Sequence, residues 1–162
     1  MKKTKTVFAE LVVCFVFCFI AIAGEPKMES KAILDKVEKN RLDQSPEWVL
    51  QQVPEHRTGP VSTSYKWTFE TNYAEVAISV LGSASEAEDS VKQARNHIPT
   101  KVNTVADLGD EAFVSQSAGI SNCMIIVRKT NVVIQVNASS LSQGEKWSRL
   151  VVEQISQSAV VK

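Results

Sequence analysis

Neither sign of charge is in excess in this chain of 162 residues, which contains 18 basic and 18 acidic side chains. Dedicated nucleic-acid binders normally carry a basic excess or a basic stripe, so nucleic acid is not an expected partner. The sequence also lacks a glycine-rich phosphate-binding loop, the metal-binding spacings C-x-x-C and H-x-x-x-H, and the nucleophile motif G-x-S-x-G. We therefore predict no cofactor, no metal site and no enzymatic activity.

Histidine is scarce as well, with His56 and His97 as the two candidate bases for a nucleophile. The catalytic candidates that remain are Cys123 with His97, and the acidic pair Asp110 and Glu111. Cys123 lies in the apolar run Cys-Met-Ile-Ile-Val, which favours a buried structural thiol over a nucleophile. We accordingly assign no catalytic residue.

Long apolar runs are missing except near the N-terminus, where Leu11 to Ile22 are twelve residues without a polar side chain. A membrane span needs about 20 apolar residues. Lysines precede this run, and the small residues Ala21 and Ala23 at its end form a cleavage site, which predicts a signal peptide over residues 1–23. An uncleaved anchor helix is the alternative. Cleavage near Ala23 would give a periplasmic or secreted protein without a stable membrane span.

Cysteine pairs are absent from the predicted mature chain, because two of the three cysteines fall inside the signal peptide. Cys123 then has no partner for an intramolecular disulfide. The remaining 139 or so residues are enough to bury a core without covalent links.

Residues 24–162 are predicted to form one α+β domain, with a largely antiparallel five-stranded sheet and packed helices in the order α-α-ββ-α-βββ-α. The first helix, over residues 27–42, has a thin apolar stripe and would be peripheral. Ser45-Pro46-Glu47 has the pattern of a helix N-cap and first turn. It predicts a short second helix that carries Trp48, Val49 and Val53.

Alternation of apolar and polar residues predicts two β-hairpins. In the first, a loop at Thr71-Asn72 would place Trp67 opposite Val76 and gather the apolar side chains on one face. In the second, a two-residue loop would place Val127 opposite Val132, whereas a three-residue loop over residues 129–131 would shift that register. The second hairpin is apolar on both faces, which predicts central strands covered by helices.

Capping boxes mark the two remaining helices. Ser83 and Glu86 begin one that ends before Pro99, and Ser142 and Glu145 begin the C-terminal one. Residues 112–116 form the additional strand, which leads to a turn at residues 118–119.

The segment Leu108 to Phe113, L-G-D-E-A-F, has two interpretations. It is either a tight turn with Gly109 at positive φ, or an acidic lip on a ligand groove. Together with the following V-R-K-x-N-V-V-x-x-V hairpin and terminal helix, this segment resembles small exported bacterial domains, both sensor-type domains and the PsbP-like α/β/α sandwich class. The resemblance covers residues 65–160 and implies a fold, without an activity or a functional residue.

An exported, non-enzymatic binding module is the function we predict, with a protein or a cell-envelope component as its partner. The alternative is a carrier or sensor for a small apolar ligand, in a cavity of roughly 300 Å³ or more lined by Met124, Ile126 or Trp147. The sequence leaves the oligomeric state open. Five residues make up the candidate partner surface: Arg128, Lys129, Asn131, Asp110 and Glu111.

Overall fold

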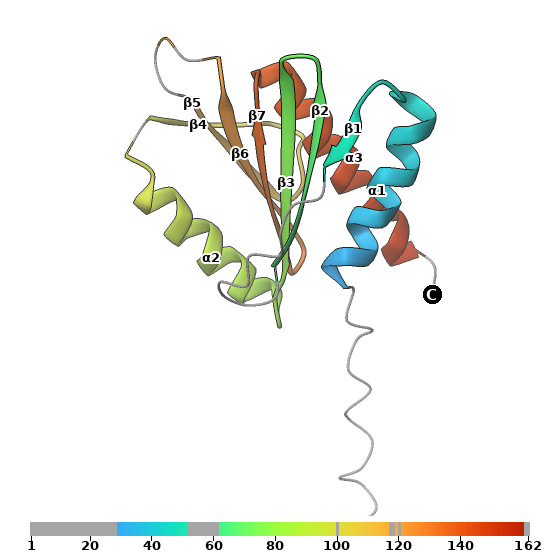
Figure 1. Ribbon diagram of the computed structural model, residues 1–162. Coiled ribbons are helices and arrows are strands. Elements are labelled where there is room, and N and C mark those ends of the chain that lie inside the picture. The colour runs from blue at the N-terminus through green and yellow to red at the C-terminus, as the bar shows by residue number, and fades with distance from the viewer. Residues whose placement is uncertain (1–28, 52–61, 100, 117–118, 120, 161–162) are drawn as a thin grey trace, which may run out of the picture.

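A seven-stranded antiparallel sheet forms the centre of the computed structural model (Figure 1). The structure describes residues 29–51, 62–99, 101–116, 119 and 121–160. Its elements are α1 (Ser30–Gln44), β1 (Val49–Gln51), β2 (Ser62–Phe69), β3 (Asn72–Val80), α2 (Ala84–His97), β4 (Val102–Thr104), β5 (Glu111–Gln116), β6 (Cys123–Lys129), β7 (Val132–Ala138) and α3 (Leu141–Val160).

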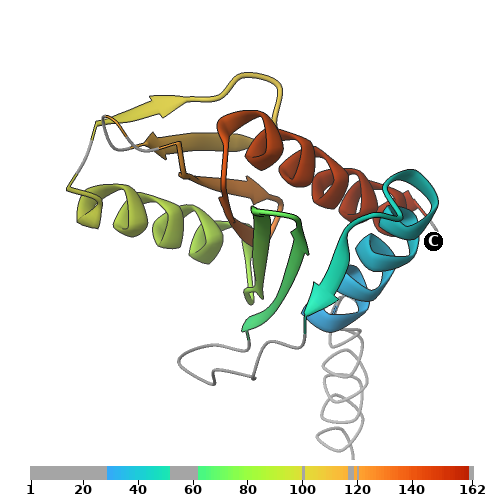
Figure 2. The same ribbon diagram turned by 45° about the horizontal axis from the view of Figure 1, so that its top comes forward.

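The strands follow the order β1-β2-β3-β7-β6-β5-β4, with every neighbouring pair antiparallel. Helices α1 and α3 lie on one face and α2 lies on the other (Figure 2). The predicted α+β class and the antiparallel sheet are thus confirmed, and the central hairpin β6–β7 contacts helices on both faces, although α2 covers only part of one face. The predicted strand number is wrong, because β1 and β4, with three residues each, extend the two edges of the sheet.

The predicted short helix after Ser45 is also wrong. The backbone N–H of Ser45 donates to the carbonyl of Arg41 and ends α1, so Ser45 does not begin a new helix. Residues 49–51 are extended and pair with residues 66–68 of β2. An exposed edge of β2 supplies these three residues with backbone hydrogen-bond partners that an isolated single turn of helix would lack.

Both predicted hairpins exist, but their registers differ from prediction. In the first, Trp67 lies opposite Ala74, and the loop is Glu70-Thr71. In the second, Lys129 lies opposite Val132 and the loop is Thr130-Asn131, so neither predicted alternative is correct. Glu70 and Thr130 have φ angles of 53° and 54°. Relative to the predicted two-residue loops, each shift moves the partner by two residues, which leaves the predicted inner face unchanged.

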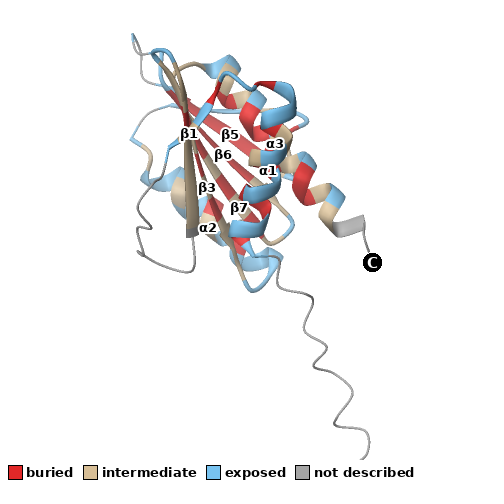
Figure 3. Cartoon of the chain, turned by 45° about the vertical axis from the view of Figure 1, so that its right-hand side comes forward, coloured by how far each residue is buried: buried red, intermediate tan, exposed pale blue. Residues whose placement is uncertain are grey.

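Two hydrophobic cores flank the sheet, and Figure 3 shows buried residues concentrated along the strands. The larger core lies beneath α1 and α3 and contains all three tryptophans, Trp48, Trp67 and Trp147. The rings of Trp67 and Trp147 stack with centroids 4.4 Å apart. The smaller core lies beneath α2, where Val91 packs on Phe113 and Ile126.

The predicted N-cap residue is confirmed at α2 and is wrong at α3. The Ser83 hydroxyl accepts the Glu86 backbone N–H at 3.1 Å, as the capping box predicts. At α3 the hydroxyl that accepts the Gln143 backbone N–H belongs to Ser140, two residues before the predicted cap at Ser142.

The predicted signal peptide and the turn at Ala118 lie outside the described residues. Within the part of the chain that the structure describes, no helix combines the length and apolar character needed to cross a membrane.

Candidate functional site

The five predicted partner-surface residues meet at the end of the sheet where β6 turns into β7. Asp110 accepts hydrogen bonds from the Lys129 ammonium at 3.0 Å and from the Thr130 backbone N–H at 2.6 Å. Arg128 lies 3.7 Å from both Asp110 and Glu111. The Asn131 side chain donates to the carbonyl of Leu81 at 2.8 Å. These charges therefore pair mainly with one another.

The tight-turn interpretation of residues 108–113 is confirmed. Gly109 has a φ of 69°, and a Cβ there would lie 2.5 Å from the carbonyl oxygen of Arg128. Leu108 and Phe113 are buried. Burial opposes ionisation of Asp110, but the bonds from Thr130 and Lys129 outweigh it and hold the pKa of this carboxyl below its usual value of 3.8. Asp110 thus joins the turn to the β6–β7 loop.

Cys123 and His97, the candidate nucleophile and base, are not brought together. The Cys123 thiol is buried on the α3 side, where it donates to the carbonyl of Ser140 at 3.3 Å. His97 is exposed at the end of α2, which packs on the opposite face, and its ring Nδ1 contacts the Gln93 carbonyl. Burial raises the pKa of the thiol above 9.0, as expected for a structural cysteine. His56 lies outside the described residues.

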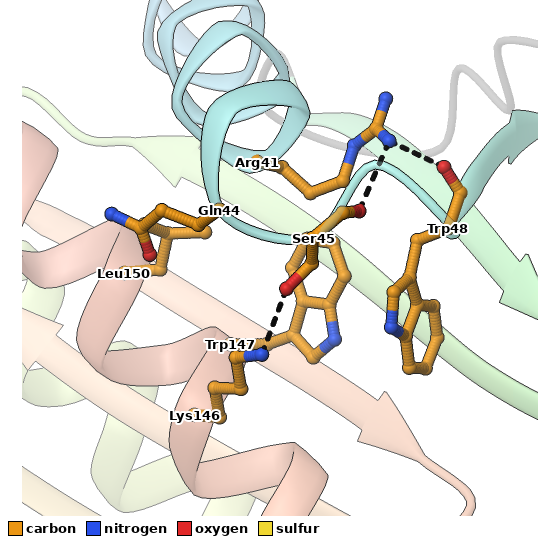
Figure 4. Close-up of a pocket in the computed structure, with 7 residues that line it drawn as sticks. All are labelled: Arg41, Gln44, Ser45, Trp48, Lys146, Trp147 and Leu150. Atoms are coloured by element: carbon orange, nitrogen blue, oxygen red, sulfur yellow. Dashed lines mark hydrogen bonds between the residues drawn. The ribbon is translucent and has the colours of Figure 1, made fainter.

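A small cavity lies between α1, the segment that follows it and α3, beside Trp48 and Trp147 (Figure 4). Its volume of about 10 Å³ is at most that of one water molecule. Arg41 and Lys146 fill its rim: Arg41 donates to the carbonyls of Ser45 and Trp48, and Lys146 donates to the Ser45 hydroxyl at 2.9 Å. The predicted apolar ligand has no room beside Trp147.

A larger hollow of about 440 Å³ opens on the other face of the sheet, beyond the part that α2 covers. Its floor is one transverse row of residues, since Glu75 pairs with Asn137, Asn137 with Met124, and Met124 with Ser115. Residues directly opposite one another in an antiparallel sheet project from the same face. Tyr73, Asn122 and Cys123 complete the lining.

Several polar groups in this hollow are not engaged by other described residues. The structure records no hydrogen bond or ion pair of the Glu75 carboxylate, the Tyr73 hydroxyl or the Asn122 amide with any other part of the described chain. Asn137 accepts a long bond of 3.4 Å from Gln135 through Oδ1, which leaves its NH₂ group for a ligand. Lys66 lies just outside, with its ammonium 5.5 Å from the centroid of the Tyr73 ring.

This hollow matches the predicted ligand cavity in its volume and in Met124, but most of its lining side chains are polar, which the sequence analysis did not predict. The available signal was the polar side chains Gln135 and Asn137, which alternate with apolar ones in a strand expected to be covered on both faces. Across the ranges that the structure describes, no group of three His, Cys, Asp or Glu side chains is placed to hold a metal ion.

The fold and the open sheet face define an α+β domain with helices on both sides of an antiparallel sheet. The extracellular domain of PknH from Mycobacterium tuberculosis has a similar fold, with a TM-score of 0.57 and 11% sequence identity. The match covers 83% of this chain and 99% of that domain. The neighbour is an extracellular bacterial domain, in keeping with the resemblance to exported bacterial domains, while the sensor-type and PsbP-like resemblances stay predictions. No protein-family model matches the chain, and no curated protein matches its sequence.

Proposed function

We propose that the chain is an exported, non-enzymatic binding domain of sensor type, which acts on a partner in the bacterial cell envelope. The observation that carries this proposal is the similarity to an extracellular domain over 99% of that domain's length. The signal-peptide pattern of residues 1–23 supports export independently of the fold. Separation of Cys123 from His97 by the sheet supports a role in binding over one in catalysis.

The hollow on the sheet is the better candidate for the binding surface. A recognition site needs polar groups that a ligand can satisfy, and Glu75, Tyr73 and Asn122 offer such groups. The surface around Arg128 and Asp110 ranks second, because a partner would have to replace the Lys129–Asp110 hydrogen bond and the Arg128 ion pairs with Asp110 and Glu111.

Export is tested by expressing the whole chain in a bacterium and measuring the intact mass of the protein in each cell fraction. We expect a mature species that begins at Gly24 or Glu25 in the periplasm or the medium. A double variant, Ala21→Leu with Ala23→Leu, is the matched control: it removes the small residues that cleavage requires, so it should keep residues 1–23. Full-length wild-type protein confined to the cytoplasm would refute the proposed function.

A further inference from the structure

The hollow over β3, β7, β6 and β5 has features that select one chemical class of ligand. Its floor row, Glu75–Asn137–Met124–Ser115, runs across four strands. Neighbouring strands lie about 4.8 Å apart, so the row is about 14 Å long. This length suits an extended ligand of a few linked rings better than a single small ion.

The charges in and beside the hollow argue against an anionic ligand. Among the described residues that line the hollow, Glu75 is the one with a formal charge, and its carboxylate offers phosphates and carboxylates no hydrogen-bond donor. Lys66 lies directly opposite Glu75 in the register, with its ammonium near the Tyr73 ring. Because this lysine offsets the carboxylate locally, a cationic ligand is not needed to balance the site.

The side chains that line the hollow combine an apolar surface with hydrogen-bonding groups. The Tyr73 ring and the Met124 side chain, both half-buried, offer contact area for C–H groups. In the floor row Asn137 lies between Glu75 and Met124, and Tyr73 lies two residues before Glu75 on β3. The exposed Asn122 amide also lines the hollow. Together these side chains provide both donors and acceptors for hydroxyl groups.

We infer that this hollow binds a neutral oligosaccharide of two or three pyranose rings, with ring C–H groups on Tyr73 and Met124 and hydroxyl groups on Asn137, Asn122 and Glu75. The inference rests on the proposed function, since it names the ligand class of that exported domain. Its site is the face of the sheet that α2 leaves open.

Titration of the purified protein, followed by NMR, tests the ligand class. The probes are two neutral trisaccharides, chitotriose and cellotriose, an anionic one, trigalacturonic acid, and the ring-free polycation spermidine. We expect a neutral trisaccharide to shift the Met124 methyl and Asn137 amide signals, and the anionic one to bind at least about tenfold more weakly. Stronger binding of spermidine or trigalacturonic acid, or no binding of either neutral probe, would overturn the inference.

Variants locate the site. Asn122→Ala and Asn137→Ala should each weaken binding about tenfold, which corresponds to one lost hydrogen bond. Asn122 is exposed and outside the strands, so its variant tests the site even if the substitution in the central strand β7 impairs folding. Asn103→Ala, an exposed asparagine of β4 outside the hollow, is the matched control and should bind as the wild type does. Equal affinity in all three variants would place the ligand elsewhere.

Failure of this inference is distinguishable from failure of the proposed function. An exported protein that binds no neutral saccharide would refute the ligand class and leave the binding-domain proposal standing. A protein retained in the cytoplasm that still binds chitotriose through Asn122 would refute export and leave the site in place.

Discussion

The carboxylate of Glu38 accepts a hydrogen bond from the indole N–H of Trp67, 29 positions further along the chain. The same carboxylate pairs with Arg41, which is only 3% exposed. Arg41 also donates to the carbonyls of Ser45 and Trp48, where the chain leaves α1 and approaches β1. The buried Arg41 guanidinium therefore supplies donors to the carbonyls that follow α1. It also holds the Glu38 carboxylate, which links α1 to the sheet through Trp67.

Replacing this guanidinium should destabilise the whole domain. We expect Arg41→Met to lower the free energy of unfolding by about 3 kcal/mol, because it removes the ion-pair partner of the half-buried Glu38 carboxylate and the donor to two carbonyls. The measurement is urea unfolding followed by tryptophan fluorescence, which reports on the ring cluster next to Glu38.

Lys31→Met is the control for the Arg41 variant. Lys31 forms a similar ion pair with Asp35 on the same helix, but its side chain is 63% exposed. Exposed pairs contribute little, so this variant should unfold close to the wild type. Equal losses in the two variants would show that burial of Arg41 is not what makes its ion pair important.

Backbone strain at Glu70 in the first hairpin predicts that a substitution there stabilises the protein. Glu70 is exposed and has a φ of 53°, a left-handed conformation that asparagine tolerates better than glutamate. We expect Glu70→Asn to raise the free energy of unfolding by about 1 kcal/mol, seen as a rise in the melting temperature of roughly 2–4 °C. Thr71→Asn, at the next position and without a positive φ, should give no such gain.

The positive φ angles at Glu70 and Thr130 explain why the sequence predicts the inner face of each hairpin but not its register. Alternation in β2 and β3 determines which side chains face the core, and the structure has that face as predicted. A shift of two residues keeps every face unchanged, so alternation alone cannot detect it. The register depends instead on Glu70 and Thr130 adopting positive φ, residue types that seldom do so.

The short edge strands and the open hollow could not be predicted from local sequence patterns either. Strands β1 and β4 have three residues each, too few for a period of two to stand out. The hollow exists because α2 packs on Phe113 and Ile126 and leaves the next transverse row, with Asn137 and the half-buried Met124, partly open. That outcome depends on tertiary packing of a helix across the sheet, which local patterns do not encode.

The hydrogen bonds to Asp110 predict that the stability of the fold depends on pH in the acid range. Because the folded state holds the pKa of this carboxyl below 3.8, ionised Asp110 stabilises the fold above that pH, and the stabilisation is lost as the pH falls through the folded-state pKa. We expect Asp110→Asn to be less stable than the wild type at neutral pH and to lose less stability on acidification to about pH 2.

Unfolding by urea over that pH range, with hydrogen exchange at the Thr130 amide, measures the effect of Asp110. Asp43→Asn removes the same charge from an exposed position on α1 and is the charge-matched control. Faster exchange at Thr130 in the Asp110 variant alone would support the hydrogen bond seen at 2.6 Å. Parallel acid curves for the wild type and the Asp110 variant would contradict the prediction.

The contact between α3 and β6 gives the sharpest test of packing around the cysteine. Gly144 is buried in the first turns of α3, and a Cβ there would lie 2.8 Å from the Cys123 Sγ and 3.0 Å from Ile125 Cδ1. Alanine favours helix over glycine by about 1 kcal/mol, but overpacking costs about 1–3 kcal/mol. We expect Gly144→Ala to destabilise the protein on balance, whereas Ser142→Ala, exposed in the same helix, should not.

Removing the thiol should relieve this overlap. In a double-mutant cycle, Cys123→Ala makes room for the new methyl group, so the double variant should be more stable than the sum of the two single changes by about 0.5–3 kcal/mol. The wild-type thiol should also react with an alkylating agent only after denaturant is added, since burial raises its pKa and shields it. Strictly additive effects would mean that the helix moves to accept the methyl group, and rapid alkylation of the native protein would mean that Cys123 is accessible to catalysis after all.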